Sequence, residues 1–133
     1  MLDYQSILAK YPNGVLATVE NTKAKTRVFQ YLFGDGNKVY FCTSSEKAVY
    51  RQLQDNPCCS FCTYAPDFSP VLSVNGKAVF VDDMELKARA LDENPGIKSI
   101  YGSAQNPAFR IFYIDAEEIE TFSFADGPQT FQI

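Results

Sequence analysis

The fold is decided by residues 26–47, which read TRVFQYLFGDGNKVYFCTSSEK. Aromatic and β-branched residues dominate 26–33 and 38–43, and this composition favours two strands. The turn sequence Gly34-Asp35-Gly36-Asn37 between them predicts a hairpin. Two serines and a lysine then occupy the point where helical spacing begins. Residues 26–47 therefore predict strand, turn, strand and helix start in direct succession.

Hydrophobic periodicity and turn residues place the other elements. Asn75 and Gly76 predict a bulge in a long strand. The tail from Asp126 is predicted to lack regular structure. The predicted strands are residues 14–20, 58–64, 71–81, 109–114 and 119–124. The predicted helices are residues 3–11, Ser44 or Ser45 to 54, and Asp82 or Asp83 to 94, with one more helical turn at 97–101.

These elements predict a mainly β (α+β) fold, in which six or seven strands form an antiparallel barrel with about three short helices at its ends. The 133 residues are long enough for one domain, residues 1–133, with a core of its own. The aromatic fraction of 14% is high, which favours an aromatic core or a surface that meets a partner.

Composition excludes several classes of function. The net charge of −4 offers no basic surface for nucleic acid. The absence of histidine excludes histidine metal ligands, histidine general bases and the hydrolases that need one. No export signal or membrane span is visible, so we expect a cytoplasmic protein without membrane contact.

The four cysteines are expected to be free thiols. Cys58, Cys59 and Cys62 lie in a predicted strand, where alternation points Cys58 and Cys62 to one face and Cys59 to the other. No glycine or proline lies among them to form the knuckle turn of a zinc site. We therefore expect neither a metal site nor a structural disulfide; a metal or redox site is the alternative.

An anion site is the chemistry that Arg27 and residues 43–47 favour. The hydroxyls of Thr43, Ser44 and Ser45 and the charge of Lys47 lie at a predicted helix start, where free N–H groups attract anions. Counting outward from the hairpin turn pairs Arg27 with about Ser44, so that arginine and lysine converge. The alternative to an anion site is an ordinary structural role for each residue: a serine caps the helix, the lysine is solvated, and the arginine lies at a sheet edge.

The sequence resembles the pyridoxamine 5'-phosphate oxidase-like, FMN-binding split-barrel family, in its short single-domain members. The resemblance runs from about residue 10 to 124 and rests on the order and spacing of segments. The segments that carry it are residues 26–33, 35–36, 39–47, Tyr50, Leu53, Asn56-Pro57, 75–83, Asn94-Pro95 and 99–101.

The resemblance implies an antiparallel split barrel that works as a homodimer, with FMN in a groove at the subunit interface. It implies a small-molecule electron donor or acceptor and identifies no catalytic residue. The cofactor site it implies consists of Arg27, Thr43, Ser44 and Lys47 at the phosphate, Ser45 as an added contact, and Val28, Phe29 and Gln30 along the isoalloxazine ring.

Two departures from the family pattern limit the expected activity. Val71 and Ser73 stand where many relatives carry a large aromatic residue and an arginine or glutamine. The chain also lacks the C-terminal substrate-binding segment of a true pyridoxamine 5'-phosphate oxidase, so vitamin B6 oxidation is not expected. Three hypotheses remain: a flavin-dependent oxidoreductase of unknown substrate, a non-catalytic FMN-binding or electron-carrier module, and a barrel that has lost its cofactor.

Overall fold

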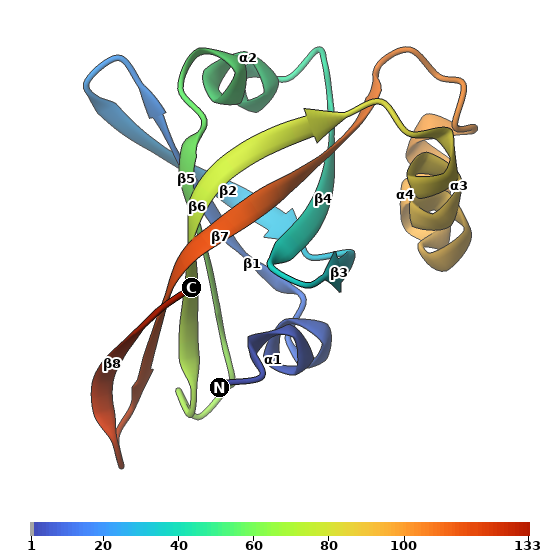
Figure 1. Ribbon diagram of the computed structural model, residues 1–133. Coiled ribbons are helices and arrows are strands. Elements are labelled where there is room, and N and C mark those ends of the chain that lie inside the picture. Colours follow the sequence, from blue (N-terminus) through green and yellow to red (C-terminus); the bar gives the residue numbers. More distant parts are fainter. Residues whose placement is uncertain (1) are drawn as a thin grey trace.

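The computed structural model describes residues 2–133, which form four helices and one eight-stranded antiparallel sheet. The sheet curls around a core, with α2 over one end and α3 and α4 side by side beyond the strands (Figure 1). The strands are β1 Asn13–Glu20, β2 Lys23–Gln30, β3 Phe33–Asp35, β4 Lys38–Ser44, β5 Cys58–Tyr64, β6 Val71–Val81, β7 Phe109–Ser123 and β8 Gly127–Gln132. The helices are α1 Tyr4–Lys10, α2 Ala48–Asp55, α3 Met84–Glu93 and α4 Pro95–Tyr101.

The predicted fold class is confirmed, with eight strands in place of six or seven and four helices in place of three. The strand order is β2-β1-β5-β6-β7-β4-β3, and β8 adds to β7. β7 runs without a break where two strands were expected. The predicted bulge is confirmed, because the β6–β7 register shifts between Asn75 and Gly76. The sheet bends there, which helps it to close around the core.

The core explains why the two ends of this open strand order come together. Phe29 of β2 packs edge-on against Phe41 of β4 and Phe112 of β7, with ring centroids 6.0 and 5.9 Å apart. Phe41 also packs against Phe61 of β5 at 4.8 Å. Strands far apart in the sheet order therefore share one apolar interior, and burial of these rings drives the closure.

The predicted hairpin register is wrong. β2 ends at Gln30 and pairs with β1, where Arg27 lies opposite Leu16. The strand that pairs with β4 across the turn is the short β3, so Arg27 is not opposite Ser44. The chain changes partner at Tyr31, whose N–H donates to Pro12, while the next N–H donates to Tyr40. The sequence does not indicate this change of partner, because the apolar stretch continues from β2 into β3 and both segments are half-buried strand.

Two further boundaries differ from prediction. α2 begins at Ala48, and its N-cap is Lys47 without a side-chain cap bond, so neither Ser44 nor Ser45 caps it. Ser44 still belongs to β4, and its Oγ accepts the N–H of Glu46 within the turn that leads to the helix. The C-terminal segment is not loose but forms β8, because Phe131 packs against the core and secures the strand. Within residues 2–133, no helix has the length and apolarity to cross a membrane.

Candidate functional site

Two neighbouring cavities lie where β2 and β4 end near α4. The first, about 160 Å³, is walled by residues of β2, the end of β4, Lys47 and α4. The second, about 340 Å³, shares Lys47, Ile100 and Tyr101 with the first and reaches Ser44. Six of the eight residues expected at a cofactor site line one or both of these cavities, namely Val28, Phe29, Gln30, Thr43, Ser44 and Lys47.

Thr43 gives the first cavity an unsatisfied polar group. The residue is 2% exposed, and its Oγ1 has no hydrogen-bond partner among the described residues. A buried hydroxyl without a partner costs about 1–3 kcal/mol. Because Thr43 lines the cavity, a ligand oxygen that reached this hydroxyl would give it the partner it lacks.

Lys47 supplies the positive charge of both cavities. It is exposed and forms no ion pair with any carboxylate of residues 2–133. Its neighbours' backbone donors are already engaged: Ser45 N–H bonds to Ala108 and Lys47 N–H to Ser44. The N–H groups of the turn before α2 are therefore not free for an anion, and binding beside this turn would rest on side chains.

The cavity mouth is apolar on two sides. Val28 and Ile100 are each 75% exposed although both are large aliphatic residues on the cavity wall. Gln30 Nε2 donates to Asn94 Oδ1 at 3.1 Å, which ties the end of β2 to the start of α4. An apolar mouth beside a hydroxyl and a cation suits a ligand with a planar apolar part and an anionic end.

Arg27 and Ser45 line neither cavity. Arg27 shares its face of β2 with Phe29 but turns towards β1 and α2, where its guanidinium bonds to Thr18 and Gln52. Burial lowers the pKa of Arg27, and no carboxylate pairs with it in the described chain. It is a half-buried cation that lacks a counter-ion.

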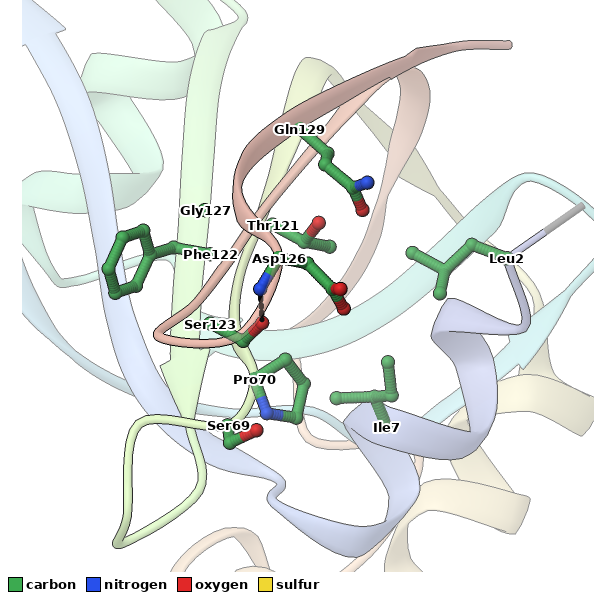
Figure 2. A pocket seen from close by; sticks show the side chains of 10 residues that line it. All are labelled: Leu2, Ile7, Ser69, Pro70, Thr121, Phe122, Ser123, Asp126, Gly127 and Gln129. Carbon is green, nitrogen blue, oxygen red and sulfur yellow. Dashed lines mark hydrogen bonds between the residues drawn. The ribbon is translucent and has the colours of Figure 1, made fainter.

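Another cavity, about 180 Å³, lies at the β7–β8 hairpin and has a different character (Figure 2). Leu2, Ile7 and Pro70 form its apolar side, and Asp126 is the charged residue on its wall. A carboxylate without a cation repels a phosphate, so this cavity is a poorer place for a phosphorylated cofactor.

The wall formed by α4 was not predicted as part of the site. Ile97, Ile100 and Tyr101 line the first cavity, although the sequence indicated no more than a helical turn there. The sequence signal that could have identified them is the i, i+3, i+4 spacing of Ile97, Ile100 and Tyr101, which places three apolar residues on one face of a helix. Cys42 also lines this cavity, and burial raises the pKa of its thiol to about 12, so it is no nucleophile at neutral pH.

Comparisons with known proteins agree with this architecture. A family model described as pyridoxamine 5'-phosphate oxidase matches residues 3–123. No curated protein matches the sequence. Among solved structures, a NimC/NimA family protein from Clostridium acetobutylicum is 24% identical with a TM-score of 0.85, covering 96% of this chain and 88% of that one.

Two other solved structures share the fold. General stress protein 26 from Bacillus anthracis is 20% identical with a TM-score of 0.82, covering 96% of this chain and 94% of that one. A pyridoxamine 5'-phosphate oxidase-related, FMN-binding protein from Nostoc punctiforme is 15% identical with a TM-score of 0.66, covering 97% and 91%.

Proposed function

Because the chain belongs to the pyridoxamine 5'-phosphate oxidase family, we propose that it is a small FMN-binding flavoprotein with oxidoreductase activity. The observation that carries this proposal is a cavity lined both by Thr43, whose buried Oγ1 has no partner among the described residues, and by the unpaired cation Lys47. A hydroxyl donor and an ammonium are the groups that a phosphate dianion requires. The Nostoc relative, an FMN-binding protein, makes FMN the phosphate ester to test first.

The residues of the site fit FMN at both of its ends. Thr43, Ser44 and Lys47 would hold the phosphate by side-chain donors, and Arg27 would join them if its guanidinium left Thr18 and Gln52. Val28 and Ile100 would cover the isoalloxazine ring, and burying two aliphatic side chains that are now exposed would contribute about 1.5–3 kcal/mol each at full burial. When bound, the flavin itself would supply the electron chemistry.

The proposal includes a homodimer with the flavin between the subunits and a small-molecule electron donor or acceptor. The apolar mouth formed by Val28 and Ile100 supports it, because a partner surface would exclude water from the ring's outer face. No described residue on the two cavity walls is a histidine or carboxylate except Glu46. We therefore assign no catalytic acid or base to the chain.

Cofactor content tests the proposal directly. The purified protein should be yellow, with the absorption bands of oxidised flavin, and acid release should yield FMN at about one equivalent per chain. Apo protein should bind FMN more tightly than riboflavin, since riboflavin lacks the phosphate. Apo protein that binds neither compound would leave a barrel without a flavin, and the proposal would be wrong.

Turnover separates an enzyme from a carrier. Flavin-loaded protein that oxidises a reduced nicotinamide in the presence of an electron acceptor would support the oxidoreductase assignment. Loaded protein that is reduced by dithionite but not by nicotinamides would favour the electron-carrier alternative.

A further inference from the structure

A further cavity of about 120 Å³ lies where β6 and β7 meet α2 and α3, and we call it the Arg110 cavity. Its wall carries two cations and one carboxylate beside apolar surface. The cations are Lys87 and Arg110, the carboxylate is Asp82, and Tyr50, Phe80 and Ile111 supply apolar surface. The Arg110 cavity shares no lining residue with the two cavities beside α4, so what it binds is a separate question from flavin binding.

The guanidinium of Arg110 lacks a polar partner. Its Nε is buried and donates to no acceptor among the described residues. No ion pair joins Arg110 to a carboxylate of residues 2–133. The guanidinium carbon lies 5.5 Å from the centroid of the Tyr50 ring, and this contact attracts the cation without giving its N–H groups an acceptor. Because a buried N–H group without an acceptor destabilises the protein, an acceptor that entered the cavity would be bound favourably.

The carboxylate on the cavity wall does not compensate both cations. Asp82 follows Val81, which pairs with Ile111, so the next step of the ladder brings Asp82 beside Arg110. The Asp82 side chain is nevertheless 90% exposed, and its ion pair is with Lys87 at 3.4 Å. The Lys87 side chain is only 9% exposed. The wall therefore carries a net charge of about +1, and one cation on it lacks a counter-ion.

We propose that the Arg110 cavity binds a small monoanionic carboxylate with a short aliphatic chain. The planar guanidinium matches the two oxygens of a carboxylate, and a single negative charge neutralises the wall. The rings of Tyr50 and Phe80, whose centroids lie 4.9 Å apart, offer apolar surface to the chain of the ligand. A cavity of about 150 Å³ holds benzene, so a cavity of about 120 Å³ admits only a smaller ligand.

Calorimetric titration of the purified protein with propionate tests the proposal, with propionamide as the uncharged probe of the same shape. We expect propionate to bind and propionamide not to bind at the same concentrations. Arg110→Met and Lys87→Met keep most of each aliphatic stem and remove the charge, and each should weaken propionate binding about tenfold or more. Arg89→Met is the matched control, because Arg89 is exposed on the same helix as Lys87, lines no part of the cavity and should leave the affinity unchanged.

Several outcomes would overturn the proposal. Propionate and propionamide that bind equally would show that the cations do not select the ligand, and equal propionate affinity in wild type and Arg110→Met would place the ligand elsewhere. Tighter binding of inorganic phosphate than of propionate would contradict a monoanion site. Wild-type protein that binds no propionate, together with a lower mass of Arg110→Met in light scattering, would mean that a carboxylate of a second subunit fills the cavity. If Arg110→Met fails to fold by circular dichroism, Lys87→Met and the two wild-type titrations decide the matter.

Discussion

Replacing Lys47 with methionine isolates the charge at the cofactor site. Lys47 is exposed and unpaired within the described chain, so its removal leaves no buried group without a partner. Methionine keeps most of the aliphatic stem that contacts the cavity wall. Arg27→Ala is a less specific test, because it would also abolish the bonds to Thr18 and Gln52.

The expected size of the effect follows from the exposure of Lys47. Two unit charges 4 Å apart attract by about 1 kcal/mol in bulk water and about 4 kcal/mol near a protein surface. A hydrogen bond to a charged group contributes about 1.5–3 kcal/mol. An exposed lysine belongs near the lower end, about 1.5 kcal/mol, so Lys47→Met should weaken FMN binding about tenfold.

Titration of FMN and riboflavin into apo protein, followed by flavin fluorescence, measures the effect. Riboflavin affinity should be unchanged, and the FMN difference should shrink as salt rises, because added ions screen an exposed charge. Lys77→Met is the matched control, since Lys77 is an exposed lysine of β6 away from both cavities. Equal FMN affinity in wild type and Lys47→Met at low salt would refute the assignment of Lys47 to the phosphate.

The remaining predictions concern assembly, thiols and the bulge. Light scattering of flavin-loaded protein should give a mass near twice the 14.9 kDa of one chain, and a monomer that retains flavin would contradict the interface site. Burial raises the pKa values of Cys42 and Cys59 to about 12, so at pH 8 both stay protonated, and iodoacetamide should label exposed Cys58 first in peptide mapping. Gly76→Ala would drive a new Cβ into a backbone carbonyl of β7, and urea denaturation should show a loss of more than about 2 kcal/mol. Gly96→Ala, which meets open space in α4, should be neutral or slightly stabilising in the same assay; a neutral Gly76→Ala would mean that the bulge adapts.

The fold was predictable where side chains alternate along a strand with one buried face. β5 and β6 begin and end at the predicted residues, because turn residues bound them and apolar residues repeat at every second position. β2 failed this rule. Its apolar stretch continues past Gln30 into residues that serve β3, and local sequence carries no mark of a change in pairing partner.

Six of the eight residues expected at a cofactor site line the two cavities, but the geometry that brings them there was not predictable. Thr43 and Lys47 do reach one cavity, but they do so from the end of β4 and the N-cap of α2 and not from a serine-capped helix. The place of Arg27 depends on Thr18 of the paired strand β1 and on Gln52, which lies 25 residues away on α2. Contacts of this kind follow from tertiary packing, which hydrophobic period and turn chemistry do not encode.

The long strand β7 has a consequence for how the chain is made. β7 pairs on one side with β6 and on the other with β4, and it joins two groups of strands that otherwise share no ladder. Synthesis proceeds from the N-terminus, so both groups leave the ribosome before residues 109–123 exist to connect them. The nascent chain must hold β4 and β6 with their edges unpaired until then, and during that interval it is most open to aggregation and to chaperones.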